Sequence, residues 1–365
     1  MAYGLSVSSE DWGGVDISSG WLPSQYIGSV STTIRYGGAA TSRVDFSGSI
    51  PADMQLFAVA STRNGYAYYQ NDQFGGYACY YAINCTVSGQ VVTVSNALWA
   101  GYANASVIGT VVTFQVYGFL PSTPDNDTYG IRFTGSGVPT MLAEGMKPHV
   151  ARWKIEADVG SASNLSYSTG IPTSETRPLS FISDTGKNAI ASYITESGGY
   201  WVVNVIRGFP NCSVNYNPAP VSGTLRVVLF TAYSGEEDEY GLSLYDDSGN
   251  VVYSMITPPL MLRRSLNNPV PYSTGSVFAA NNSDQFTAEE LAQEPMILGQ
   301  LYGIGRISSR YHWELGTIVT SDGKYTVGTI RQAPTVYVGG NANGWWGPTY
   351  AGSAGKWIAG TDYFN

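Results

Sequence analysis

The chain has 365 residues, with a formal charge of −9 from 18 basic and 27 acidic residues. Charged residues make up 12%, against about 25% in an average globular protein, whereas glycine (43 residues) and aromatic residues (13%) are abundant. This composition argues against a helical bundle, and the 43% of hydrophobic residues argues against disorder. The acidic balance argues against binding nucleic acid. The lack of a long apolar run argues against membrane insertion, and the first residues lack the pattern of a standard secretion signal.

A short motif, Tyr-Gly-apolar-polar-apolar, occurs three times, at residues 3–7, 129–133 and 240–244. A glycine-containing turn and then a proline-containing segment follow each copy. A second apolar strand is visible after the turn at residues 15–17 and 251–253. The repeat therefore predicts that the chain contains three related units, each opening with a short hairpin.

The three copies divide the chain into three units. The strand patterns inside them predict an all-β fold of three tandem antiparallel β-sandwich-like domains with minimal helix. The predicted domains span residues 1–121, 127–234 and 239–340, followed by a Gly- and Trp-rich C-terminal extension at residues 341–365. The first linker contains two prolines and the second four consecutive acidic residues, so we expect the domains to be strung like beads.

Strand patterns recur inside the units. Residues 87–94 predict a hairpin with Ser-Gly at its turn, and residues 318–327 predict two strands around an Asp-Gly turn. Residues 200–206 predict a buried strand, and β-branched strands at residues 110–117 and 224–230 close the first two units.

One helix is predicted, at residues 287–292. Thr287 is a favourable N-cap residue, and Glu290 follows three positions later, which is the pattern of a capping box. Pro295 is expected to end the helix.

Candidate chemical groups are sparse. Cys79, Cys85 and Cys212 are too few for a disulfide framework and are interpreted as free thiols packed as small hydrophobic side chains, with a Cys79–Cys85 bridge as the alternative. His149 and His312 lack metal-ligand spacing and are expected at the surface or at strand ends.

No catalytic motif stands out either. Residues 246–250 resemble part of a calcium loop but fit a hairpin turn better, and the sequence contains neither a phosphate-binding loop nor a nucleophile elbow. We therefore predict that the chain is not an enzyme, with no catalytic residue, metal or cofactor.

Two aromatic clusters are candidate binding surfaces, because Tyr and Trp give large contact areas with a polar group attached. The alternative interpretation, which the pattern favours, is core or subunit contact for the first cluster and an assembly contact for the second. The candidate binding residues are Tyr66, Tyr68, Tyr69, Tyr77, Tyr80, Tyr81, Trp345, Trp346 and Trp357.

The opening, Met1-Ala2-Tyr3-Gly4-Leu5 followed by a turn and an apolar strand, resembles the start of a group of tailed-bacteriophage tail proteins. The recurrence of Tyr-Gly at residues 129 and 240 supports the resemblance, which covers about the first 20 residues of each unit and brings no catalytic residues. It implies a structural part of a tail fibre, tail tip or baseplate, in the virion and assembled in the host cytoplasm.

The resemblance also implies partners: other copies of the chain, with a trimer expected, other phage tail proteins, and a glycan or protein receptor on the host surface. An alternative interpretation is a cell-surface or secreted carbohydrate-binding or adhesion module. A tail depolymerase and a capsid decoration protein are further alternatives.

Overall fold

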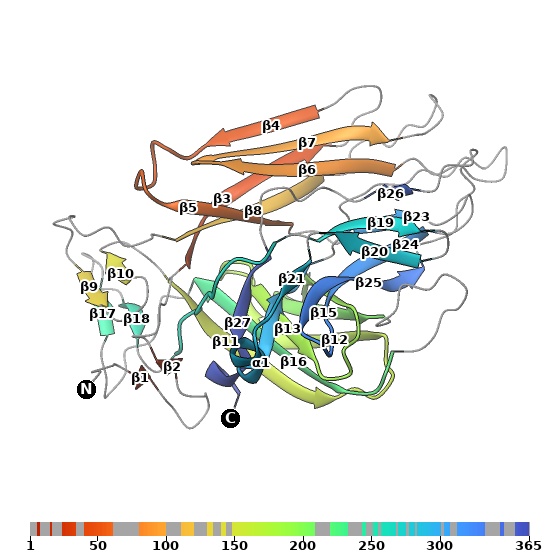
Figure 1. Cartoon of the computed structure of the whole chain (residues 1–365). Coiled ribbons are helices and arrows are strands. Elements are labelled where there is room, and N and C mark those ends of the chain that lie inside the picture. Colours follow the sequence, from red (N-terminus) through yellow and green to blue (C-terminus); the bar gives the residue numbers. More distant parts are fainter. Residues whose placement is uncertain are drawn as a thin grey trace.

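A computed structural model of the chain is built almost entirely of antiparallel β-strands, which confirms the predicted all-β fold class (Figure 1). The structure describes residues 6–7, 15–16, 24–33, 40–60, 80–99, 111–119, 130–133, 140–143, 148–208, 220–232, 243–245, 251–254, 257–267, 269–274, 277–281, 283–300, 303–306, 312–332, 344–346 and 355–364.

Three separate two-stranded antiparallel sheets lie where the Tyr-Gly motifs predict hairpins. The acidic turn at residues 246–250 lies outside the described residues, but the strands on either side of it pair as a hairpin requires. The paired strands are β1 (Ser6–Val7) with β2 (Val15–Asp16), β9 (Gly130–Phe133) with β10 (Thr140–Ala143), and β17 (Ser243–Tyr245) with β18 (Val251–Ser254).

Unit one follows the first hairpin and contains six strands, namely β3 (Ser24–Thr33), β4 (Ala40–Asp45), β5 (Gln55–Ala60), β6 (Tyr80–Ser88), β7 (Val91–Trp99) and β8 (Val111–Phe119). They form two sheets with the orders β3-β8-β5 and β4-β7-β6. Inward residues of both sheets, such as Val94 and Phe114, make one core. Gly89, with φ 57°, forms the predicted turn between β6 and β7.

Unit two has the same connectivity as unit one. Its strands are β11 (His149–Asp158), β12 (Asn164–Pro172), β13 (Leu179–Asp184), β14 (Ile190–Ser197), β15 (Tyr200–Arg207) and β16 (Thr224–Ala232). The orders are β11-β16-β13 and β12-β15-β14, so the first, sixth and third strands form one sheet and the second, fifth and fourth the other. The first strand of each unit also has a bulge at its fourth residue, Ile27 or Arg152.

Unit three, residues 257–364, keeps a reduced version of this topology with insertions. Its strands are β19 (Val270–Thr274), β20 (Val277–Asn281), β21 (Asp284–Gln285), β22 (Pro295–Leu298), β23 (Gly303–Arg306), β24 (His312–Val319), β25 (Lys324–Gln332), β26 (Gly344–Trp346) and β27 (Trp357–Ala359). β22 pairs β27, and β25 pairs both β21 and β24. Gly323, with φ 81°, lies in the predicted Asp-Gly turn between β24 and β25.

Units two and three share their sheets. β13 pairs β22 through Phe181–Leu298 and Ile182–Ile297, and β14 pairs β24 through Ile190–Thr317. We call this junction the seam. The predicted division between domains 127–234 and 239–340 does not coincide with a division between sheets, because these edge strands satisfy each other's free backbone groups.

A second hydrophobic core joins all three units. Phe57 and Tyr117 of unit one pack with Phe181 and Phe230 of unit two and with Ile358 of unit three. Figure 1 shows the two sheets of unit one (red to orange) stacked above the strands of units two and three (green to blue). The described residues thus form layers with a shared core, whereas the sequence predicts domains strung like beads.

The five-stranded sheet β11-β16-β13-β22-β27 is covered on both faces. Along β16, consecutive residues 227–231 are all buried, with Val228 and Phe230 facing unit one and Val227 and Leu229 facing the other sheet. Such double coverage favours a continuous apolar run over an alternating pattern. One short segment lies along both outer strands, because the N–H of Leu260 donates to the carbonyl of His149 at 2.8 Å and that of Leu266 to the carbonyl of Gly355 at 2.7 Å.

The predicted helix is confirmed as α1 (Ala288–Ala292). The Thr287 hydroxyl accepts a hydrogen bond from the Glu290 backbone N–H at 3.1 Å, and the Glu290 carboxylate accepts one from the Thr287 N–H at 2.8 Å. This capping box starts the helix as predicted, and Pro295 begins the following strand β22.

Candidate functional site: the seam between units two and three

The structure separates the predicted binding residues. Tyr80 and Tyr81 begin the edge strand β6, and Trp345 and Trp346 lie on the edge strand β26, paired with Gly305 and Ile304. Only the strand positions of these four residues are described. The other tyrosines of the first cluster lie outside the described residues: Tyr66, Tyr68, Tyr69 and Tyr77.

The prediction that Trp357 is a binding residue is wrong. Its side chain is 2% exposed in the core between the two sheets, with its ring centroid 5.1 Å from that of Phe286. Tyr363 and Phe364 are also buried, in the core shared with unit one. The predicted C-terminal extension therefore completes the fold at residues 355–364, because its apolar side chains cover the sheet next to it.

The predicted cysteine and histidine environments are partly confirmed. Cys85 is free and buried in the core of unit one, where burial raises the pKa of its thiol to about 12, and a Cys79–Cys85 bridge is therefore wrong. Cys79 and Cys212 lie outside the described residues. His149 and His312 both begin strands as predicted, but His149 is buried between units one and two.

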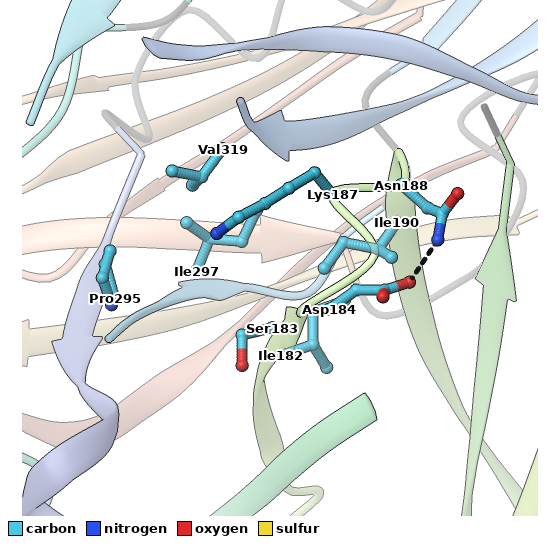
Figure 2. A pocket seen from close by; sticks show the side chains of 9 residues that line it. All are labelled: Ile182, Ser183, Asp184, Lys187, Asn188, Ile190, Pro295, Ile297 and Val319. Atoms are coloured by element: carbon cyan, nitrogen blue, oxygen red, sulfur yellow. Dashed lines mark hydrogen bonds between the residues drawn. The ribbon is translucent and has the colours of Figure 1, made fainter. Parts of the chain in front are cut away.

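The seam combines a cavity, a surface groove and a cluster of charged residues, and we take it as the candidate site. A small cavity of about 20 Å³ lies between the two sheets, lined on its apolar side by Ile182, Ile190, Ile297 and Val319. Figure 2 shows Lys187 extending across this cavity towards Ile297. The opening continues into a surface groove of about 260 Å³.

Two residues at this groove have a backbone conformation that side chains other than glycine rarely adopt. Lys187 has φ 53° and Glu294 has φ 52°, and they line the groove from unit two and unit three respectively. Such conformations persist where the surrounding structure holds them, and they are concentrated at functional sites. Here both flank strands that meet at the seam, Lys187 between β13 and β14 and Glu294 directly before β22.

A buried ion pair supports the seam from the side of unit two. Arg207 Nε lies 2.7 Å from Asp184 Oδ2, and both side chains are at most 1% exposed. Nη1 of the same guanidinium donates to the carbonyls of Gly160 and Ala162, and Nη2 donates to the carbonyl of Val221. Because the charge is fully surrounded by acceptors, this pair fixes the loops at the end of unit two.

A second set of hydrogen bonds connects Asp184 to the turn that contains Lys187. Asn188 Nδ2 donates to Asp184 Oδ2 at 3.0 Å, drawn as a dashed line in Figure 2, and the Gly186 N–H donates to Asp184 Oδ1 at 2.8 Å. Nothing in the sequence pairs Asp184 with Arg207, 23 residues away, so sequence analysis missed this cluster.

Arg226 links the two units across the groove. Its guanidinium donates to Glu156 of unit two at 2.7 Å and to Glu294 of unit three, and it lies over the ring of Phe364. Burial lowers the pKa of Arg226, but the hydrogen bonds to the two carboxylates outweigh it and raise the pKa above its ordinary value. The Arg226–Glu294 pair thus joins units two and three at the groove, as a structural contact between units would.

Among the described residues, no group of three or more His, Cys, Asp or Glu is placed to hold a metal ion. The helices of the described part of the chain are too short and polar to cross a membrane.

The fold and the seam define a multi-unit β-protein in which units two and three associate through strand edges. Residues 4–329 match a family of unknown function, DUF6453, and the chain belongs to this family. No curated protein and no solved structure matches the chain.

Proposed function

We propose that the chain is a structural component of a bacteriophage tail, in a fibre, tip or baseplate, where it takes part in virion assembly. The observation that carries the proposal is the repeated module, in which a Tyr-Gly hairpin precedes a β-unit, and units one and two share topology and bulge position. The Met-Ala-Tyr-Gly-Leu opening supports the same assignment through its resemblance to tail proteins.

The physical properties of the module suit a mechanical role. Cores shared between units resist local opening, since a strand cannot leave without exposing apolar surface of its neighbours. Assemblies of identical subunits use such rigid modules to present self-complementary surfaces. In this proposal the chain contacts other copies of itself and other tail proteins, and its loops and aromatic residues contact the host surface.

Immunogold labelling of purified virus particles, with an antibody raised against this chain, tests the proposal. We expect label at the distal tail, the fibres or the baseplate, and its position would decide among them. Antibody pre-absorbed with the purified chain is the control. Absence of label on both intact and partly dissociated particles would overturn the assignment and favour a cellular adhesion module.

A further inference from the structure

The seam joins the third and fourth strands of unit two, β13 and β14, to β22 and β24 of unit three. The edge of unit one that corresponds to β13 and β14 can be identified from its topology. There it consists of β5 and β6, which are the outer strands of their sheets and pair with no further strand among the described residues. Unit one therefore presents the edge through which its two relatives in the same chain associate.

The register shows which residues correspond. Ser24 and His149 begin the first strands and pair with Phe119 and Ala232, so Tyr117 corresponds to Phe230. The residues opposite these two, Phe57 and Leu179, then correspond as well. Continuing along the strands, Ala58 corresponds to Ser180, Val59 to Phe181 and Ala60 to Ile182.

The β6–β7 and β14–β15 hairpins of the other sheet also correspond, through their turns. This correspondence places Tyr81 at the position of Ile190.

The seam has the geometry of an approximate two-fold contact. β13 and β22 occupy corresponding places, since each pairs with the last strand of its unit, β16 or β27. They pair antiparallel with each other around the pair Phe181–Leu298. The Gly299 N–H donates to the Ser180 carbonyl at 2.7 Å, so Ser180 directs its backbone groups across the seam. By register, Ala58 directs its own N–H and C=O to the free edge of β5.

The β5–β6 edge also lacks the features that normally prevent strand pairing. Neither strand contains a charged residue, a proline or a glycine, and neither pairing has a bulge. The opposite edges of units one and two are protected. β3 and β11 have bulges, β4 and β11 carry charges, and β12 has Pro172 and an irregular register. Among the described residues, these protective features are thus absent from the edge that corresponds to the seam.

We propose that the β5–β6 edge of unit one is an interaction surface for a second copy of this chain, paired antiparallel around Val59 in the manner of the seam. A two-fold contact follows, because a strand that pairs antiparallel with its own copy is related to it by a two-fold axis. A second copy is the occupant because it alone brings an identical edge, and the chain already pairs two such edges internally. The pairing lies in the plane of the sheet, perpendicular to the face of Phe57 and Val59 that packs on unit two.

This inference does not depend on the proposed tail function, and it revises the trimer expected from the resemblance. The first test measures the molar mass of the full-length chain by light scattering after size exclusion, over roughly a hundredfold range of concentration. We expect a monomer–dimer equilibrium. A chain that stays monomeric throughout, or that forms a trimer, would overturn the proposal.

Two variants locate the contact. Ala58→Pro removes the edge N–H while leaving the β8 pairing in place, and we expect it to weaken dimerisation by roughly tenfold. Ala58→Ser is the matched control, since it keeps the N–H and serine is the residue at the corresponding position 180. Circular dichroism checks that both variants fold. Equal dimerisation of a folded Ala58→Pro and the control would contradict the proposed edge.

Cross-linking provides a readout that does not require a disruptive variant. Val59 would lie opposite its own copy in a closely spaced pair, so Val59→Cys should form an intermolecular disulfide on mild oxidation. Val30→Cys, on the opposite edge strand β3 and also buried, is the control. Both are made in a chain with Cys79 and Cys212 replaced by Ser. Cross-linking of the control but not of Val59→Cys would refute the arrangement.

Discussion

Units one and two have the same strand order and the same bulge, yet their surroundings differ. In β16 of unit two the middle residues are buried on both faces, whereas β8 of unit one begins with alternating exposure and Val111 is 50% exposed. The edge of unit two is paired with unit three, and the corresponding edge of unit one is unpaired among the described residues. One topology can therefore serve as a central layer or as an outer module, depending on which faces and edges its side chains leave apolar.

The largest expected effect comes from removing residues 339–365. From the sequence alone, this truncation is predicted to leave three folded units but to impair assembly or adhesion. The structure places Trp357, Ile358 and Tyr363 in two cores, and each large buried side chain contributes roughly 3–5 kcal/mol. Their joint loss is comparable with the whole stability of a domain, about 5–15 kcal/mol. We expect thermal unfolding followed by circular dichroism to show loss of the cooperative transition, with removal of Asn365 alone as control. An unchanged midpoint would contradict the role of these residues.

The second largest effect on stability is expected at the buried ion pair at the end of unit two. Arg207→Ala leaves the Asp184 carboxylate buried without its cation, and we expect a loss of about 3–5 kcal/mol in the free energy of unfolding. Urea denaturation measures this loss. Arg264→Ala, at a more exposed ion pair in unit three, should cost less than about 1 kcal/mol. Equal losses in the two variants would show that burial of the pair is not what stabilises unit two.

The contact between units one and two should weaken in acid. His149 Nδ1 donates to the Ser24 carbonyl at 2.9 Å, and its ring packs edge-on against Tyr117 of unit one. Burial lowers the pKa of His149 to about 4, so the unfolded chain binds its proton first. The stability associated with neutral His149 is therefore fully present above pH 6.5 and falls by about 3 kcal/mol as the pH is lowered to 4.

His149→Gln should reduce this pH dependence of the unfolding free energy, because glutamine does not titrate. The measurement is a urea titration at several pH values between 7 and 4, on the wild-type chain and the variant. Identical pH slopes for the two chains would contradict the assignment to His149.

The smallest expected effect compares two glycines that allow close packing. A Cβ at Gly316 would lie 2.5 Å from the Ile190 carbonyl at the seam, which is backbone and cannot move aside. A Cβ at Gly118 in unit one would first meet the flexible end of Met54. We expect Gly316→Ala to cost about 1–3 kcal/mol and Gly118→Ala less, by thermal unfolding. The reverse order would show that the seam tolerates separation better than the core of unit one does.

The comparison of units also shows where local sequence was sufficient. The Thr287–Glu290 capping box and the hairpin turn at Gly89 depend on residues within a few positions of each other, and both are confirmed. The Tyr-Gly repeat correctly predicts three short hairpins. By contrast, the residue type of Trp357 and its Gly- and Trp-rich segment predict a binding residue, but its side chain is buried in a core. Local sequence could not show this, because exposure depends on what packs against the side chain.

By itself, the sequence determined the all-β class, the repeat and the strands within each unit, since alternation, turn residues and caps act over short distances. Only the tertiary structure decided that units two and three share sheets, that Asp184 meets Arg207, and that the last residues complete two cores. These contacts join positions far apart in the chain. Their formation depends on which apolar edges and faces are left over once each unit has folded, and no local pattern encodes that outcome.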